Sequence, residues 1–297
     1  MQSVNQIKSV KKLHSIQRNH NRHWVGDGFP VRTLFAYLNL DPLSISPFLL
    51  LDYAGPMDFL PTNHRRGVGE HPHRGFETVT IVYEGEVEHR DSSGGGGIIS
   101  PGDVQWMTAA SGLVHDEFHS RNFARRGGKF EMVQLWVNLP AKYKMSEPGY
   151  QSITSDRIPS INLADDAGIV RVIAGEFAEY KGPAKTFTPI NVWELRLASK
   201  KQTKLKIPDG YTTILVVLQG AVRVNEFEVL EEAQTGIFDR PGTSIHLDCT
   251  KNAKLLFLSG EPIDEPVVGQ GSFVMNSFSE IRQAMLDYQN GKMGNLP

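Results

Sequence analysis

Short apolar runs separated by turn residues constrain the fold of this chain more than any other feature. The runs include residues 33–37, 78–83, 133–137 and 213–218, and Gly, Pro, Asn and Asp lie between them. Runs of this kind, bounded by turn residues, are typical of β-strands. Many short strands at such spacing predict an all-β sandwich or barrel.

One strand–turn–strand pattern occurs twice. Residues 79–87, which contain a Gly turn, resemble residues 214–222, and a Pro-Gly turn follows each copy, at residues 101–102 and 241–242. The two resemblances have nearly the same offset along the chain, which indicates an internal repeat. We therefore predict two β-barrels of like design in tandem, with their boundary near residues 147–149.

This division gives an N-terminal arm over residues 1–29, a first barrel over 30–147 and a second barrel over 148–297. The arm is locally basic and rich in histidine, and we expect it to be solvated. A short helix is expected near the C-terminus, because Ser277 and Glu280 form a capping box. An apolar stripe follows the cap and should pack on a barrel; it consists of Ile281, Ala284, Met285 and Tyr288.

Charge and cysteine content narrow the class of protein. Lys and Arg total 31 and Asp and Glu total 33, so the net charge of −2 gives no support for direct nucleic-acid binding. The single Cys249 excludes an internal disulfide framework and a cysteine-based metal site. No apolar run is long enough to span a membrane, and no signal-peptide core is present. We expect a cytoplasmic protein, or a nuclear and cytoplasmic one if the source is eukaryotic.

Two pairs of metal-binding residue types lie beside predicted strands. His71 and His73 precede the run at 76–83, and His115 and Glu117 lie beyond the Pro-Gly turn. Residues i and i+2 of a strand point to the same face, so each pair can project into one space. Either pair alone is weak evidence. Together, three imidazoles and one carboxylate suit a divalent first-row metal and leave one or two octahedral positions open for chemistry or ligand exchange.

The second copy of the repeat lacks these ligands. When Gly85 is aligned with Gly220, the positions of His71 and His73 fall on Lys206 and Pro208. His246 stands alone near the second turn and is expected to be structural. We therefore predict one metal per chain, in the first barrel.

Longer motifs around the ligands resemble the pirin family of the cupin superfamily. These motifs are residues 71–79, 101–109, the His115-x-Glu117 pair and 134–139, and a C-terminal signature resembles residues 260–276. The resemblance implies an all-β fold of two tandem cupin (jelly-roll) barrels, with iron in the first barrel. It maps the metal ligands onto His71, His73, His115 and Glu117. Other cupins use a carboxylate at the position of Glu77, which we interpret here as a group that orients an imidazole.

The resemblance also implies an activity like that of quercetin 2,3-dioxygenase. In that reaction O2 cleaves the ring of a flavonol, a small aromatic substrate, and CO is lost. Fe(II) is the expected metal, although the same ligands accept Zn, Mn, Ni or Cu. Glu117 is the expected catalytic base, because it could accept the 3-hydroxyl proton.

The substrate pocket is predicted from residues near the ligands. An apolar slot for a flat substrate would be lined by Phe76, Trp106, Met107 and Phe118. Core packing is the alternative role for each of these aromatic residues. Arg74 would hold an anionic substrate oxygen, or else pair with Glu77 or Asp103.

Two other functions fit the same residues. The first is a non-catalytic, metal-dependent redox sensor or transcriptional co-regulator that acts through a protein partner. The second is a cupin isomerase or decarboxylase with a different metal. Oxygen uptake with quercetin separates the dioxygenase from the sensor.

Overall fold

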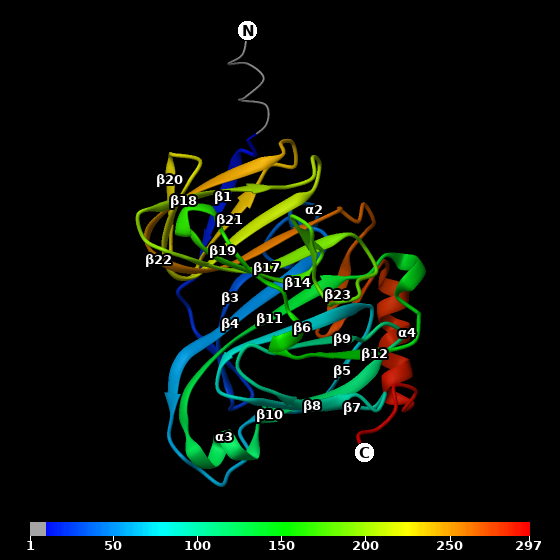
Figure 1. Ribbon diagram of the computed structural model, residues 1–297. Coiled ribbons are helices and arrows are strands. Elements are labelled where there is room, and N and C mark those ends of the chain that lie inside the picture. The colour runs from blue at the N-terminus through cyan, green and yellow to red at the C-terminus, as the bar shows by residue number, and fades with distance from the viewer. Residues whose placement is uncertain (1–9) are drawn as a thin grey trace. The chain divides into compact units, whose positions relative to one another are not determined.

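A computed structural model describes residues 10–297 and shows a chain built mainly from β-strands (Figure 1). This confirms the predicted all-β class. The first nine residues of the expected N-terminal arm lie outside the described residues. Three α-helices occur in the described part of the chain, at α2 (Pro42–Ile45), α3 (Arg121–Arg126) and α4 (Phe278–Gln289). None of the described helices has the length and apolar character needed to cross a membrane.

The chain divides into two compact units. One unit contains all the predicted metal ligands and is called the metal-site unit; it comprises Asn21–Thr33, Phe48–Ser155 and Ile263–Pro297. The other, called the second unit, comprises three segments: the chain up to His20, Leu34–Pro47 and Asp156–Pro262. These units differ from the expected division at both ends of the chain. The N-terminal strand β1 (Leu13–Arg18) pairs with β21 (Gln234–Phe238) of the second unit, whereas α4 packs on strands of the metal-site unit.

Two large sheets build most of the metal-site unit. The larger has the order β12-β9-β6-β11-β4-β3-β2, and the smaller has the order β5-β10-β7-β8. The strands of the larger sheet are β2 (His23–Val25), β3 (Phe29–Ala36), β4 (Phe48–Phe59), β6 (Phe76–Glu84), β9 (Val104–Thr108), β11 (Gly128–Asn138) and β12 (Gly149–Ile153). Those of the smaller are β5 (Gly67–His73), β7 (Val87–Asp91), β8 (Gly96–Ile99) and β10 (Leu113–His119).

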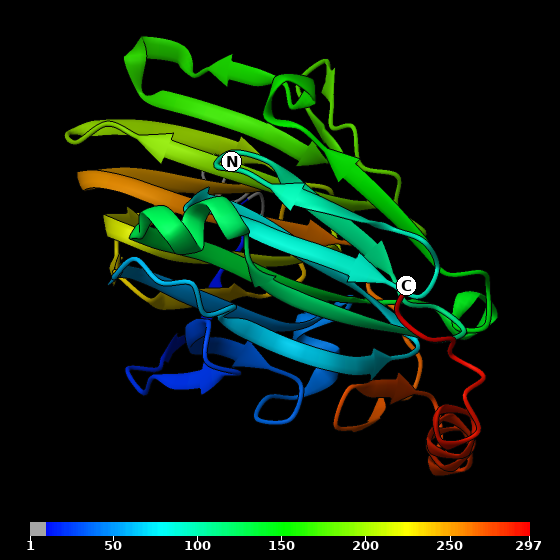
Figure 2. The same ribbon diagram turned by 90° about the horizontal axis from the view of Figure 1, so that it is seen from below.

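The helix α4 begins at the predicted cap. The Ser277 hydroxyl accepts a hydrogen bond from the backbone N–H of Glu280 and donates one to the Glu280 carboxylate. Ile281 and Ala284 are buried and pack in one cluster with Phe273 of β24 (Phe273–Met275). Figure 2 shows α4 nearly end-on beside the hairpin of β24 and β23 (Val268–Gln270), which it contacts. Ile281 and Ala284 of the predicted stripe therefore cover this hairpin, whereas Met285 and Tyr288 are exposed.

One large sheet dominates the second unit. Its main path is β1-β21-β19-β22-β17-β14-β13, with β18 and β20 paired to β22 and β19. The strands not yet introduced are β13 (Ser160–Asn162), β14 (Gly168–Ala174), β17 (Ile190–Leu197), β18 (Lys201–Lys206), β19 (Thr212–Val224), β20 (Glu228–Glu231) and β22 (Ser244–Gly260); β15 (Glu176–Phe177) and β16 (Tyr180–Lys181) form a separate hairpin.

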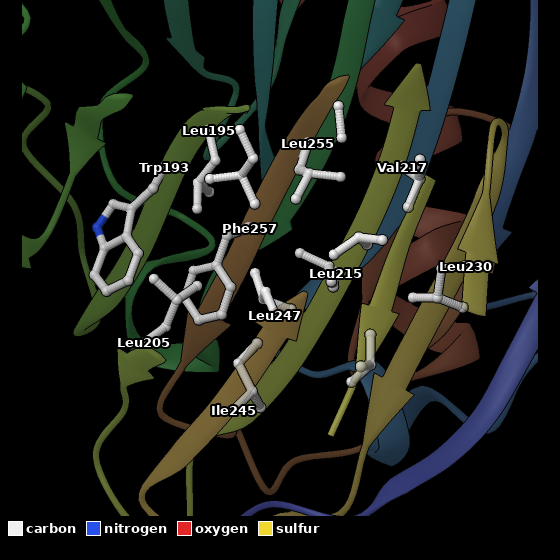
Figure 3. Close-up of a cluster of buried hydrophobic side chains, with 14 of the residues drawn as sticks. Trp193, Leu195, Leu205, Leu215, Val217, Leu230, Ile245, Leu247, Leu255 and Phe257 are labelled. Carbon is white, nitrogen blue, oxygen red and sulfur yellow. The ribbon is translucent and has the colours of Figure 1, made fainter. Parts of the chain in front are cut away.

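Apolar side chains fill the interior of the second unit. Trp193 stacks on Phe257, and leucines from β17, β19 and β22 surround them (Figure 3). Burial of each such side chain contributes roughly 1.5–3 kcal/mol. Lys206 and Pro208, which replace two of the predicted ligands, are exposed. Within residues 10–297, both groups of side chains that could hold a metal lie in the metal-site unit.

Candidate metal centre

Three histidines converge between strands β5 and β10. The two strands pair antiparallel, with His71 opposite His115 and His73 opposite Leu113. The Nε2 atoms of His71 and His115 lie 2.9 Å apart. The ring of His73 lies 4.9 Å from that of His71 and 4.7 Å from that of His115, measured between centroids. The i, i+2 spacing in the sequence thus brings these three imidazoles together.

The charge state of His73 and His115 suits a metal. Burial, together with the neighbouring imidazoles, holds the pKa values of His73 and His115 well below the usual range. Both rings are therefore neutral at physiological pH and have a nitrogen lone pair to offer. His71 is only partly buried, and its Nδ1 lies 2.8 Å from the carbonyl oxygen of Gly69. Because a carbonyl only accepts, that nitrogen carries the hydrogen, and Nε2 of the neutral ring has the lone pair that can coordinate a metal.

Glu117 lies in an adjoining group of ligand-type atoms. Its carboxylate joins His89 and His115 in a second cluster, so His115 belongs to both. Three polar side chains hold the carboxylate: the amide of Gln134 donates to Oε2 at 2.9 Å, and Gln105 and Thr80 donate to Oε1 at 3.3 and 3.4 Å. Glu117 is thus buried, oriented and next to the three-histidine group.

Glu77 has a different partner from the one expected. It was expected to orient an imidazole, but its Oε1 instead accepts a hydrogen bond of 2.7 Å from the Thr108 hydroxyl. The alternation of β6 explains this, since Phe76 and Thr80 face the histidines and Glu117 while Glu77 faces the opposite side. Burial raises the pKa of Glu77 to about 7, and the hydrogen bond from Thr108 opposes that rise.

Arg74 is part of a structural clamp. It was expected to hold a substrate oxygen, or to pair with Glu77 or Asp103. Instead its Nη1 pairs with the carboxylate of Asp287 on α4 at 2.9 Å, and its Nε donates to the Ser111 carbonyl. The side chain is almost fully buried, and these two contacts use its Nη1 and Nε atoms.

The predicted aromatic slot is only partly assembled. The ring of Phe76 lies 5.2 Å from that of His73. Trp106 follows Gln105, whose side chain reaches Glu117, so alternation along β9 turns Trp106 to the other face. Phe118 likewise follows Glu117 on β10 and packs under the guanidinium of Arg65. Met107 packs in a small core cluster with Ala109, Leu113 and Tyr150.

The site also contains residues that the sequence motifs did not predict. Trp136 of β11 lies 5.6 Å from the His73 ring and 4.3 Å from Phe76. His89 of β7 contacts His115 and pairs with Asp91. A signal for His89 was available, because His89-x-Asp91 has the same i, i+2 spacing as the two ligand pairs and lies on the intervening strand.

Comparison with known proteins identifies related chains. Residues 30–137 match the family model Pirin, and residues 192–294 match the model of the pirin C-terminal cupin domain. A Pseudomonas aeruginosa protein named "Putative quercetin 2,3-dioxygenase" is 56% identical over 95% of this chain and 98% of its own length. Human pirin is 35% identical over 84% of each chain.

Solved structures agree with these matches. A crystal structure of quercetin 2,3-dioxygenase from Acinetobacter baumannii superposes with a TM-score of 0.94 at 52% identity, covering 97% of this chain and 99% of that one. A bacterial pirin from Escherichia coli, solved in complex with nickel(II), superposes with a TM-score of 0.62 at 19% identity, covering 84% of this chain and 99% of that one. The second likeness supports the fold alone.

Proposed function

This chain belongs to the pirin family, with two cupin domains, and on that premise we propose that it is a metal-dependent dioxygenase of the quercetin 2,3-dioxygenase type. Its substrates would be a flavonol-like aromatic molecule and O2. The observation that carries the proposal is the convergence of three histidines, two of them buried and neutral, next to an oriented carboxylate.

The donor set fits a divalent metal. His71 and His115 direct their Nε2 atoms at each other from 2.9 Å, and a cation that both can bind would stabilise two ring nitrogens at that distance. We propose that His71, His73 and His115 hold Fe(II), with Glu117 as the fourth protein ligand. Such a metal, when bound, supplies Lewis acidity for a phenolic oxygen and redox chemistry for O2.

Glu117 is the proposed base. The amides of Gln105 on β9 and Gln134 on β11 hold its carboxylate in one orientation. The carboxylate therefore loses no further conformational freedom when the reaction takes place. From this position it would accept the proton of the substrate hydroxyl, provided the hydroxyl approaches to within about 3 Å.

Trp136 is the proposed aromatic contact of the substrate, and the fully buried Phe76 supports its ring. Their rings pack on each other at 4.3 Å with a tilt of 32°, and both lie close to His73. Trp136 remains partly exposed, so part of its ring is available to a flat ligand. Aromatic rings favour offset or edge packing on such surfaces.

The proposal is tested with iron-reconstituted protein. We expect quercetin loss, O2 uptake and CO release together, and we expect Glu117→Gln to lose turnover by a larger factor than it loses iron. The amide can still offer an oxygen to the metal but cannot take up the proton. His246→Ala, in the second unit, is the control and should turn over like the wild type. Wild-type protein with full iron occupancy and none of the three signals would contradict the proposal and favour a metal-dependent sensor.

A further inference from the structure

His89 lies next to the proposed ligands although neither the ligand set nor the base uses it. It is almost fully buried on β7, which pairs with β10 so that His89 is opposite Glu117 and Asp91 is opposite His115. The Nδ1 atom of His89 lies 3.2 Å from Nδ1 of His115 and 3.9 Å from Oε1 of Glu117. Each ring nitrogen of a buried imidazole needs a hydrogen-bond partner of the complementary kind, either a donor or an acceptor.

Asp91 determines which nitrogen of His89 carries the hydrogen. Its Oδ1 accepts hydrogen bonds from the Ser93 hydroxyl and from the backbone N–H groups of Ser93 and Gly95, at 2.6, 2.8 and 3.0 Å. Burial alone would raise the pKa of Asp91, but the donors from His89, Ser93 and Gly95 together hold it below its usual value. An ionised carboxylate only accepts, so the His89 Nε2 atom, 3.1 Å from Oδ2, is the donor.

In a neutral imidazole, a hydrogen on Nε2 leaves a lone pair on Nδ1, which here is the His89 atom nearer to His115. That lone pair faces Nδ1 of His115. When a cation occupies Nε2 of His115, its neutral ring carries its hydrogen on Nδ1, and this hydrogen can be donated to His89. The ring of Tyr150 stacks on His89 at 5.2 Å with an interplanar angle of 14°, which keeps the imidazole in the required plane.

We propose that His89 is a positioning residue of the metal centre. Its Nδ1 accepts the Nδ1–H of His115 and so holds His115 with the Nε2 lone pair directed at the metal, while Asp91 holds His89 in the matching tautomer. A hydrogen-bond partner of this kind fixes the orientation of a ligand and raises its basicity. The inference rests on the proposed metal centre but not on the substrate or the reaction.

A second metal ion is the competing interpretation of the same atoms. His89, His115 and Glu117 could together offer three donors to it. That arrangement requires His115 to lose both ring hydrogens and to bridge two cations. Glu117 is the one carboxylate that the set offers to balance the charge of the second cation. We therefore favour the hydrogen-bonded chain over a second ion, and metal stoichiometry distinguishes the two.

Zinc binding by calorimetry tests the role of the acceptor, with zinc as the probe and metal-free protein in the cell. In His89→Asn the amide oxygen can take the place of Nδ1, so we expect an affinity close to that of the wild type. His89→Leu offers no acceptor and should bind zinc about 10–100-fold more weakly. Equal losses in the two variants would overturn the proposal, because packing rather than the acceptor would then matter.

Asp91→Asn tests the direction of the chain. The Asn oxygen satisfies the donors from Ser93 and Gly95, so its NH2 group faces Nε2 of His89 and drives the hydrogen of His89 to Nδ1. His89 would then donate to His115 instead of accepting, and zinc affinity should fall about 10–100-fold. An unchanged affinity in a folded Asp91→Asn protein would contradict the proposal, and this variant serves even if His89→Leu fails to fold.

The tautomers themselves are a second readout. The chain has ten histidines, so long-range ¹⁵N–¹H spectra of zinc-loaded, ¹⁵N-histidine-labelled protein can be assigned with single variants. We expect hydrogen on Nε2 of His89 and on Nδ1 of His115. Hydrogen on Nδ1 of His89, or two zinc ions per wild-type chain, would overturn the proposal. Because neither readout depends on turnover, a lack of quercetin cleavage would bear on the proposed function alone.

Discussion

Strand alternation, more than distance along the chain, determines which side chains face this site. His71 and His73 share a face because they are two residues apart, and the same rule places Gln105 and Gln134 toward Glu117. Trp106, one residue from Gln105, is turned away for the same reason. Alternation was visible in the sequence, so Trp106 could have been excluded there once the face of Gln105 was known.

Glu77 makes the stability of the protein depend on pH. Its pKa is raised by burial from 4.5 to about 7 in the folded state. Between these values the folded state binds more protons than the unfolded state, so the stabilisation is complete at low pH and is lost as pH rises through about 7. The expected loss is about 3 kcal/mol, at 1.36 kcal/mol per pKa unit.

Urea unfolding of the wild type and Glu77→Gln at pH 5 and pH 8 measures this effect. Glutamine keeps an oxygen for the Thr108 hydroxyl but does not ionise. Because pH 5 already lies slightly above the unfolded pKa, we expect the stability difference between the two proteins to shift by about 2.5 kcal/mol in favour of the variant between pH 5 and pH 8. The same difference at both pH values would show that the carboxylate titrates normally.

Elements far apart in sequence meet at the end of β5. The sequence did not predict this contact. The capping box predicted α4, but nothing local indicated that its Asp287 would hold Arg74, which directly follows the proposed ligand His73. That pairing depends on the tertiary fold. For the same reason, the sequence placed α4 with the second barrel rather than with the metal-site unit.

Removal of Asp287 should destabilise the metal-site unit. Asp287→Ala leaves the Arg74 guanidinium buried with one of its acceptors gone, and the loss of one partner of a buried ion pair costs about 3–5 kcal/mol. Thermal or urea unfolding measures the change. Arg282→Ala, at an exposed position of the same helix, is the control and should change stability by less than about 0.5 kcal/mol. Equal effects of the two substitutions would rule out the clamp.

At the scale of the whole molecule, each of the two units buries an apolar core of its own. The second unit buries a continuous cluster around Trp193 and Phe257, and the metal-site unit buries another around Phe123 and Phe130. The internal repeat predicted this two-barrel organisation. It did not show that β1 belongs to the second unit, because an isolated edge strand carries no signal for its partner.

Removal of the metal should therefore lower stability without unfolding the chain. Chelated protein is expected to keep its far-UV circular dichroism and to melt cooperatively at a lower temperature, since the metal binds the folded state alone. The melting temperature should recover as metal is added back. Loss of the far-UV signal on chelation alone would mean that the metal supplies the folding energy.

The metal content per chain tests the central claim most directly, which is that this pirin holds one metal, on histidines of the metal-site unit. Elemental analysis of purified, metal-reconstituted protein should give one metal per wild-type chain, close to none for His71→Ala or His115→Ala, and one for His246→Ala. Two tightly bound metals per wild-type chain, or an unchanged content in His71→Ala and His115→Ala, would contradict the account.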